Sequence, residues 1–516
     1  MLAPLLKLGA AASIASTVFA QLPIANDTGN GVHVPGAIPA NLDEPLQHHL
    51  AFAGPNGMTV SWASFNQIQT PTVWYGTDPA NLNMKASSNE SATYPTSRTY
   101  DNHVALTGLK PATKYYYKVS YTNTPAAAYR PLYSFTTSRA AGDMTPFTLA
   151  SFADLGLMGM DGLSTKVGSI SGDMTTALGV NDTNTIQSLL ELKDSYEFMH
   201  HYGDIAYADS FLGEAISGYF GTDNASTQPT QEQVATQYES FLEQFFDQMQ
   251  PVTAEKPWMV SVGNHEANCD EGGTTDSQTG MVYNASYCVE GQTNFTFYQH
   301  HYRMPGKMSK GEGNFWYSYD YGMAHLIALD TETDLGNNLT GPSNVPGDYN
   351  GPFGYQNEQI NWLVDDLRRV DRNKTPWVVV FLHRPWYTST DAPTWPAWQQ
   401  AFEKIFYDYG VDIYTQGHVH NYERFTPMFN GTVDPNGLNN PRAPWPILNG
   451  AAGHYDGFSR FDDGPRYNGS AYSTDNTYGW GRLTFLDAEH AKYEFVASRN
   501  STVVDSATLY KKRHLA

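Results

Sequence analysis

The sequence predicts an α/β protein of two domains, in which a β-sandwich precedes a layered βαβ domain made of two sheets flanked by helices. Two observations predict this fold class. The chain has 516 residues, 41% of them hydrophobic, which is more than one core usually supports and enough for two. The pattern also changes near residue 140, from short alternating strands with turns to apolar runs that alternate with helical segments.

The N-terminus predicts export. Residues 1–20 contain one lysine, Lys7, then an apolar stretch over 8–19 and a small-residue end at Ala20, as in a cleaved secretory signal. A lead segment is expected over 21–47. No other stretch is long and apolar enough to span a membrane, so we expect a soluble, secreted protein.

Asn-x-Ser/Thr sequences fit this route and predict N-linked glycans, although several would arise by chance in a chain this rich in Asn, Ser and Thr. The eleven sites are Asn26, Asn89, Asn181, Asn224, Asn284, Asn294, Asn338, Asn373, Asn430, Asn468 and Asn500.

The two cysteines, Cys269 and Cys288, leave two interpretations open. In an oxidising compartment they can pair and close a loop of about 20 residues. In a cytosolic protein, two free buried thiols would be expected instead.

The formal net charge of −22 argues against nucleic acid or an anionic membrane as a partner, because both are bound by basic surfaces. It also sets a requirement. If the substrate is an anion, a local positive charge must overcome this negative field.

Residues 48–139 predict the sandwich. The alternating runs are MTVSW, TVWYG, HVALTGL, KYYYKVSY and LYSFTT, and short strands at this spacing are typical of a β-sandwich. The piece LTGLKPATKYYYKV resembles the tyrosine-corner region of fibronectin type III-like domains, which implies a domain of that kind.

Six apolar runs predict the strands of the second domain, expected over 145–505. They are FTLASFA (147–153), YEFMHHY (196–202), WMVSV (258–262), HLIALD (325–330), WVVVFL (377–382) and VDIYT (411–415). Between them, two stripes keep the spacing of an amphipathic helix and predict core packing. One stripe is Val234, Tyr238, Phe241, Leu242, Phe245 and Met249, and the other is Ile360, Leu363, Val364 and Leu367.

Five of these runs end in side chains that can bind a metal. Asp154 follows the first run, Asp204 and Tyr207 the second, Asn264 the third, His383 the fifth, and His418 and His420 the sixth. The carboxyl ends of strands in an open α/β sheet gather polar groups, so these residues can converge although they span 266 positions. The pair His418 and His420 alone would more often be two ordinary histidines, so the other ligands decide the interpretation.

Seven ligand side chains exceed what one tetrahedral or octahedral ion accepts beside a substrate. They suit two ions that share one carboxylate. Glycine precedes Asp204, Asn264 and His418, which permits tight turns and a close approach of the backbone to the site.

This series resembles the metallophosphoesterase signature of the purple acid phosphatases, including the tyrosine of GDIAY. The fibronectin-like domain before it is similar to the N-terminal domain of the large plant and fungal members, and the resemblance covers essentially the whole mature chain. It implies that a ferric ion binds Asp154, Tyr207 and His420, and that Asp204 bridges this ion and a second one. It further implies that a divalent ion (iron, zinc or manganese) binds Asn264, His383 and His418.

The chemistry of the phenol supports a ferric ion independently. Phenol loses its proton near a pH of about 10 in water, so binding as phenolate in mild acid requires a strongly polarising cation. Ions of +3 and +2, less the charges of Asp154, Asp204 and Tyr207, leave about +2, whereas two divalent ions would leave a charge lower by one unit. A ferric site therefore provides the positive charge that an acidic surface lacks.

The expected activity is an acid phosphatase that hydrolyses phosphate monoesters by in-line attack of a metal-bound hydroxide. His265, adjacent to a ligand, is placed to donate a hydrogen bond to the phosphate or to protonate the leaving oxygen. The alternative is a histidine that only orients Glu266 or a ligand.

Two departures from the family pattern are present. The first motif reads ADLG, so Ala153 stands where the family has glycine. Plant members also carry adjacent histidines some way after the HxPWY segment, whereas this chain runs HRPWYTSTDAPTW, so a second phosphate contact is unassigned. His454 could substitute, or have only a structural role, and Glu423 and Arg424 could orient His420, contact phosphate or form an ordinary salt bridge.

Alternatives remain on the same core, because surrounding loops select the substrate. A phosphodiesterase, a nucleotidase and a phytase are open, and the insertions at 212–250 and 267–314 are expected to shape the pocket. The alternative of another class is a catalytically dead secreted binding protein, which would be expected to have lost ligands. The sequence makes no prediction about the oligomeric state.

Overall fold

The computed structural model describes residues 39–120, 131–158, 182–209, 231–269, 288–332, 357–390, 394–453, 457–461 and 463–513. The expected signal over 1–20, His454 and parts of both insertions lie outside these residues. So do five of the predicted glycosylation sites, Asn26, Asn181, Asn224, Asn284 and Asn338. Within the described ranges, no helix has the length and apolar character needed to cross a membrane.

The first domain is the predicted β-sandwich, in which alternate residues of each strand face the core. Its strands are β1 (Leu46–Phe52), β2 (Met58–Ser64), β3 (Thr72–Gly76), β4 (Met84–Ser87), β5 (Ser91–Ala92), β6 (Tyr100–Leu106), β7 (Lys114–Ser120) and β8 (Tyr133–Thr136). They form two four-stranded sheets, in the orders β1-β2-β6-β5 and β4-β3-β7-β8. The backbone N–H of Lys110 donates to the hydroxyl of Tyr115 (3.2 Å), as a tyrosine corner requires.

The second domain contains the two predicted sheets. A six-stranded sheet has the order β11-β10-β9-β21-β22-β23, and a seven-stranded sheet has the order β12-β13-β14-β15-β19-β16-β20. The strands of the first are β9 (Phe147–Phe152), β10 (Phe198–Tyr202), β11 (Trp258–Ser261), β21 (Gly479–Phe485), β22 (His490–Ala497) and β23 (Thr502–Tyr510). Those of the second are β12 (Tyr317–Tyr321), β13 (Ala324–Ala328), β14 (Trp377–Phe381), β15 (Ile413–Gln416), β16 (Tyr422–Phe425), β19 (Trp445–Asn449) and β20 (Ser470–Thr474).

Helices cover the outer faces of these sheets. They are α2 (Thr185–Glu191), α4 (Gln231–Thr253), α5 (Thr296–His301), α6 (Gly306–Ser309), α7 (Glu358–Arg369), α8 (Pro396–Trp398) and α9 (Lys404–Tyr409). A π-helical turn, Gln399–Glu403, joins α8 to α9, and a short hairpin is formed by β17 (Met428–Phe429) and β18 (Thr432–Val433).

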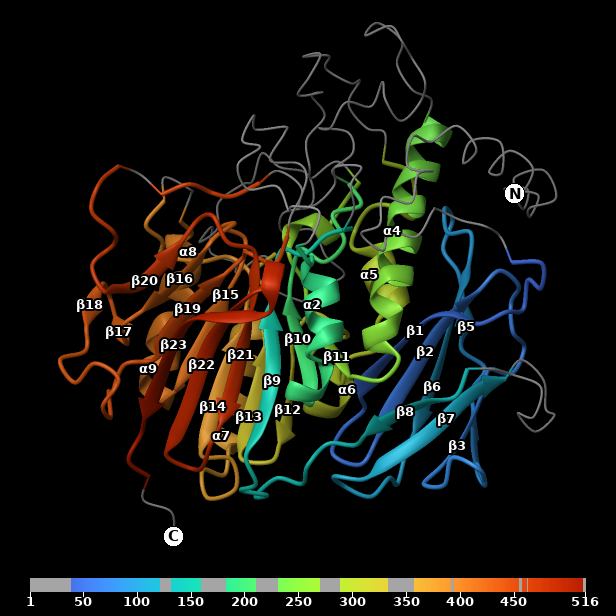
Figure 1. The fold of residues 1–516 in the computed structure, drawn as a ribbon, viewed down its shortest axis with the longest axis horizontal. Helices are drawn as coiled ribbons and strands as arrows, with labels where there is room; N and C mark the ends of the chain where they lie inside the picture. The colour runs from blue at the N-terminus through green and yellow to red at the C-terminus, as the bar shows by residue number, and fades with distance from the viewer. Residues whose placement is uncertain are drawn as a thin grey trace, which may run out of the picture.

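Strand β14 shows why four layers form. Its side chains alternate between two cores: Val379 and Phe381 pack against the other sheet, and Val378 and Val380 pack in the core that contains the helices. A strand buried on both faces reads as a continuous apolar run, which is how this strand was recognisable in the sequence. The fold class predicted from the sequence is confirmed (Figure 1).

Two details of the sequence prediction need correction. No strand was predicted after residue 415, although β16 and β19–β23 lie there, and β21 completes the first sheet by pairing antiparallel with β9. Strand β23 is largely exposed, and β16 (YERF) and β19 (WPILN) are buried throughout but contain charged residues or a proline, so they lack the continuous apolar runs that marked the others. In α7 the buried face is rotated from the predicted stripe. It consists of Gln359, Trp362, Leu363, Asp366 and Leu367, because the polar residues Gln359 and Asp366 have partners and are buried.

Helix α4 joins the two domains. Figure 1 shows it standing beside the sandwich. Near its end, the hydroxyl of Thr253 donates to the carbonyl of His48 in β1 (2.8 Å), and Gln250 accepts from the N–H of the same residue (3.1 Å). The guanidinium of Arg98 forms an ion pair with Glu243 on the helix. The sandwich is therefore fixed to the domain that carries the ligands.

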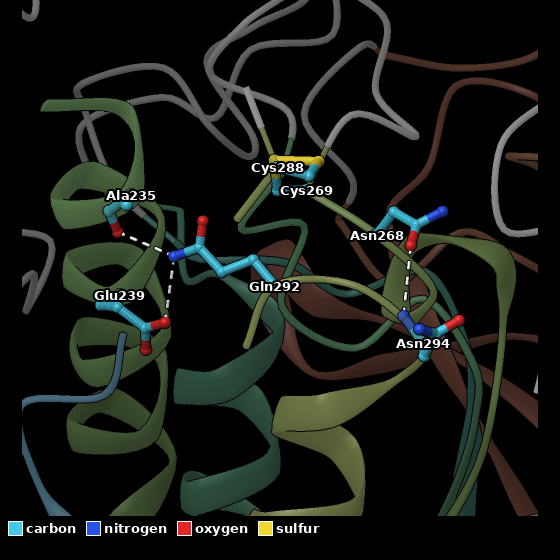
Figure 2. Close-up of a disulfide and its surroundings, with 7 residues drawn as sticks. All are labelled: Ala235, Glu239, Asn268, Cys269, Cys288, Gln292 and Asn294. Carbon is cyan, nitrogen blue, oxygen red and sulfur yellow. Dashed lines mark hydrogen bonds between the residues drawn. A yellow bond between two sulfur atoms is a disulfide. The ribbon is translucent and has the colours of Figure 1, made fainter. Parts of the chain in front are cut away.

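The cysteines are paired. Cys269 and Cys288 form a disulfide with 5.4 Å between their Cα atoms, which decides between the two interpretations of the sequence. Figure 2 shows its surroundings: the amide of Gln292 donates to Ala235 (2.9 Å) and Glu239 (3.1 Å), both on α4. Gln292, four residues after Cys288, thus ties the chain beside the cross-link to the long helix.

Candidate metal centre

The seven predicted ligands come from five strand ends in two sheets. Strands β9, β10 and β11 pair in parallel, as do β14 and β15, so their carboxyl ends lie on the same side. The first sheet supplies Asp154, Asp204, Tyr207 and Asn264, and the second supplies His383, His418 and His420. The structure brings all seven together.

One group of donors surrounds the hydroxyl of Tyr207. This oxygen lies 2.9 Å from Asp154 Oδ1, 3.1 Å from Asp204 Oδ2 and 2.9 Å from His420 Nε2. His420 Nε2 is in turn 3.4 Å from Asp154 Oδ1. Four donor atoms from three loops therefore converge on one point.

A second group lies beside it. His383 Nε2 is 3.1 Å from Asp204 Oδ2 and 3.2 Å from His418 Nδ1. His418 Nδ1 is also 2.8 Å from the side-chain oxygen of Asn264. Because Asp204 Oδ2 belongs to both groups, this carboxylate has the position that a bridge between two ions requires.

The donor spacing fits metal ions. With metal–ligand bonds of about 2.1 Å, neighbouring donors around one ion stand about 3.0 to 3.4 Å apart, depending on geometry. The observed separations run from 2.8 to 3.4 Å. Carboxylate, phenol and imidazole atoms meet in the first group, and carboxylate, amide and imidazole atoms in the second, and positive charge between such electron-rich atoms offsets the cost of burying them. The residues present therefore fit two cations.

The backbone at the ligands is held in an uncommon conformation. Asp154, Asp204, Tyr207 and His418 have φ values of 61°, 52°, 49° and 68°, in the left-handed region. Non-glycine residues there are uncommon, and each such position costs roughly 1 to 3 kcal/mol. These left-handed turns direct the side chains back over the ends of their strands. The backbone conformation that costs free energy is therefore the one that places the ligands.

Glycine allows the loops to approach. A Cβ on Gly203 would lie 2.6 Å from His383 Nδ1, and one on Gly263 would lie 2.3 Å from Asp204 Oδ1. The departure at Ala153 is accommodated in the same way, because its methyl group faces Gly417, where a Cβ would lie 2.5 Å away. The alanine therefore does not displace the loop that carries His418.

Glu266 ties two of these loops together. Its buried carboxylate accepts the backbone N–H groups of Gly263 (2.7 Å), Asp204 (2.9 Å) and Ile205 (2.7 Å). Burial, assisted by the charge of Asp204, raises the pKa of Glu266 to about 8. The carboxylate fixes the loop after β10 against the loop after β11.

His265 faces the first donor group. Its ring packs on Tyr207 with centroids 4.3 Å apart, and its backbone N–H donates to Asp204 Oδ1 (3.0 Å). Nδ1 lies 2.7 Å from the buried carboxylate of Asp209. The predicted alternative, that His265 only orients Glu266 or a ligand, stays open, because its backbone N–H binds Asp204 and its ring packs on Tyr207. Sequence reasoning missed Asp209, although it follows the tyrosine of GDIAY by two residues.

Charges shift the pKa values of the ligands themselves. Burial raises the pKa of Asp154. Burial also penalises the charge of Asp204, but His383 and His265 outweigh it and hold the pKa of that carboxyl well below its usual range. Burial opposes the charge of His383, yet Asp204 raises its pKa to about 9. The site therefore attracts positive charge at Asp204 and His383, where the two donor groups meet.

The residues considered for the second phosphate contact have other partners. Arg424 binds Asp505 through two hydrogen bonds (2.6 and 2.9 Å), which is the ordinary salt bridge among the three alternatives. Glu423 accepts the N–H of Ser389 (2.9 Å) and its hydroxyl. In the segment HRPWYTSTDAPTW, the structure places Trp395 against His418, with ring centroids 4.5 Å apart. Nothing in the residue spacing predicted that contact.

Comparisons with known proteins agree with this geometry. Residues 45–137 match the purple acid phosphatase N-terminal domain, residues 170–422 the calcineurin-like phosphoesterases, and residues 443–506 the iron/zinc purple acid phosphatase-like protein C family. The chain is 37% identical over 506 residues to acid phosphatase A of Cryphonectria parasitica, covering 92% of this chain and 93% of that protein.

Two further similarities extend across most of the chain. An acid phosphatase of Aspergillus ficuum is 31% identical over 554 residues, covering 90% of this chain and 86% of its own length. Among solved structures, a purple acid phosphatase from yellow lupin (Lupinus luteus) seeds superposes with a TM-score of 0.66 at 22% identity, covering 92% of this chain and 75% of that one. At that identity the superposition supports the fold alone.

Proposed function

The chain belongs to the purple acid phosphatases and is a metal-dependent acid phosphatase, and we propose that it is a secreted glycoprotein that hydrolyses phosphate monoesters at a centre of one ferric and one divalent ion. In this proposal Asp154, Tyr207 and His420 bind the ferric ion. Asn264, His383 and His418 bind the divalent ion (iron, zinc or manganese), and Asp204 bridges the two. The domain division over 48–139 and 145–505 is part of the proposal.

One observation supports the ferric ion above others. The hydroxyl of Tyr207 lies at the centre of a donor group that already contains the carboxylates Asp154 and Asp204. A phenol, with an ordinary pKa of about 10, binds as phenolate in mild acid only beside a strongly polarising cation, and a trivalent ion polarises it better than a divalent one. When bound, the pair of ions supplies Lewis acidity that offsets phosphate charge and acidifies a water molecule.

The chain's own residues supply orientation and a proton. His383 Nδ1 donates to the carbonyl of Tyr202 (3.1 Å), which fixes the tautomer and leaves Nε2 facing Asp204. We assign His265 to donating a hydrogen bond to a phosphate oxygen, since its ring is only 11% exposed and lies beside Tyr207 at the edge of the donor groups. Asp209 holds that ring in place.

Exposure supports glycosylation. Every predicted site that lies within the described residues is solvent-exposed, and these sites are Asn89, Asn294, Asn373, Asn430, Asn468 and Asn500. Attachment of a glycan requires an accessible asparagine. Treatment of the secreted protein with an endoglycosidase should lower its mass, and an unchanged mass would contradict this part of the proposal.

The alternative of a catalytically dead binding protein predicts damaged ligand geometry, whereas the two donor groups are intact. Turnover of p-nitrophenyl phosphate at mildly acid pH, inhibited by fluoride or phosphate, separates the two functions. Metal analysis should find two ions per chain, and a visible absorption band should accompany them. Tyr207→Phe should abolish that band, so an unchanged spectrum would exclude ferric ligation by this residue.

A further inference from the structure

Trp395 is an aromatic side chain at the edge of the candidate metal centre that the predicted site did not include. It is only partly buried, and its ring meets the imidazole of His418 edge-on, at an interplanar angle of 89°. Because His418 is a donor of the second group, the indole lies directly beside the position proposed for the divalent ion. The indole is therefore an apolar surface next to the second donor group.

A buried ion pair holds this ring. The guanidinium of Arg384 lies over the indole, 5.0 Å from its centroid, at a distance typical of a cation–π contact. Arg384 is bound in turn by the carboxylate of Glu332, with a shortest distance of 2.6 Å and with Glu332 only 1% exposed. Because the charges of Arg384 and Glu332 offset each other, this ion pair orients the indole without adding net charge to the site.

The backbone of Trp395 is fixed as well. Its N–H donates to the carbonyl of Pro385 (3.2 Å), close to the ligand His383, and its own carbonyl accepts from Trp398 (3.0 Å) at the start of α8. The residue therefore occupies a set position although 12 residues separate it from His383 in sequence. Such a support is expected of a surface that must keep one geometry.

The two donor groups have different neighbours. His265 packs against Tyr207 in the first group, and Trp395 packs against His418 in the second. A phosphate placed over both groups thus has a hydrogen-bonding residue at one end and an indole at the other. The organic part of an ester that extends toward the second end would contact the exposed part of the indole.

We propose that Trp395 is a specificity-determining residue that binds the aromatic group of aryl phosphate esters. The inference rests on the proposed phosphatase function, and it adds the class of substrate. Aromatic pairs attract each other beyond the burial of area alone, and the contact is uncharged, so the net charge of −22 does not weaken it. Aliphatic phosphate esters gain only part of this contact.

The test compares phenylphosphonate with methylphosphonate as inhibitors of the metal-loaded, full-length protein. The two carry the same phosphonate group and are not hydrolysed, so their inhibition constants isolate the aromatic contact. The wild type should bind phenylphosphonate about tenfold more tightly. Trp395→Ala and Trp395→Leu should remove that preference, and Trp395→Phe should retain most of it.

A matched control is Trp74→Ala. Trp74 lies in β3 of the sandwich with Lys85 over its ring at 5.4 Å, so it has the same kind of cation–π contact away from the donor groups. This variant should keep the preference. Unfolding midpoints of the variants show that the Leu and Phe substitutions leave the domain folded.

The outcomes separate the two proposals. If the wild type neither binds two ions nor turns over p-nitrophenyl phosphate, the proposed function fails. If turnover and metal content are as expected but the wild type shows no preference, or Trp395→Leu keeps it, the role of Trp395 alone is overturned.

Discussion

Asp209 fixes the ring of His265: Nδ1 of the imidazole lies 2.7 Å from an oxygen of the Asp209 carboxylate, which has no exposed surface. A protonated imidazole that donates from Nδ1 to Asp209 presents a second donor, the Nε2–H, on its other side. That nitrogen lies 3.9 Å from Asp204 Oδ2, at the edge of the donor groups. The pair therefore has the form of an oriented hydrogen-bonding group.

Replacing Asp209 with alanine should lower kcat roughly 10- to 100-fold, the loss typical when a residue that orients a functional histidine is removed. The metal content should not change, because Asp209 is not a donor in either group. Steady-state kinetics and metal analysis of the same preparations measure both quantities.

The control for this prediction is a double-mutant cycle. If Asp209 acts through His265, the variant Asp209→Ala/His265→Ala should be no slower than His265→Ala alone. Additive losses would mean that Asp209 has a separate role, and loss of metal in the single variant would mean that it supports the ligands directly.

Asp204 should be required by both ions. Its Oδ2 lies 3.1 Å from Tyr207 in one donor group and 3.1 Å from His383 in the other. Asp204→Asn should therefore lower occupancy of the two metals together, because a neutral amide is a poor bridge between cations. His418→Ala, which removes a donor from the second group alone, should lower only the divalent ion. Equal loss of one metal in both variants would argue against bridging.

Glu266 should contribute to stability and to metal binding. Glu266→Gln keeps the shape of the side chain. In the wild type both carboxylate oxygens accept backbone N–H groups, and in the variant an amide N–H₂ would face some of these donors. Leaving such buried donors unpaired costs about 1 to 3 kcal/mol, so the free energy of unfolding should fall by that amount. Denaturant titration measures the change.

Glu423→Gln provides the comparison for Glu266. Glu423 is also fully buried and accepts a backbone N–H from Ser389, but it lies in β16 and not on the loops after β10 and β11 that Glu266 ties together. Both variants should lose stability, and only Glu266→Gln should also bind the metals more weakly. Equal metal affinity in the two variants would show that Glu266 has no effect on the loop that carries Asp204.

The parts of the site that sequence could predict follow from one physical rule. Strands buried on both faces are continuous apolar runs, and the polar residues after their carboxyl ends must meet at one edge. Asp154 and His383 were identifiable in this way. Asp209 was not, because its approach to His265 depends on the left-handed turn at Tyr207, whose φ of 49° is not evident from residue types.

Trp395 and the buried face of α7 are two further features that residue patterns could not predict. Trp395 reaches His418 only because its backbone returns to Pro385 through a hydrogen bond, which no periodicity encodes. In α7, Gln359 and Asp366 occupy buried positions that an apolar stripe would have assigned to solvent. They are buried because each has a partner, and pairing between distant residues is invisible to a local pattern.

His325 should make stability depend on pH at neutral to alkaline values. Its ring lies between Asp320 (2.7 Å) and Asp366 (2.8 Å), and burial opposes its charge, but the two carboxylates raise its pKa to about 9. Since the folded pKa exceeds the value of about 6.5 in the unfolded chain, the contribution is complete below a pH of about 6.5 and is lost as the pH rises through about 9. Its size is roughly 3 kcal/mol.

This dependence can be measured as the free energy of unfolding at several pH values between 6 and 10, by denaturant titration of the disulfide-intact protein. The wild type should lose stability over that window, and His325→Gln, which has no proton to lose there, should lose less by roughly 3 kcal/mol. Arg369 also contacts Asp366 (3.1 Å) and stays charged throughout, so it does not produce the slope. Parallel pH curves for the two proteins would show that His325 is not protonated in the folded state.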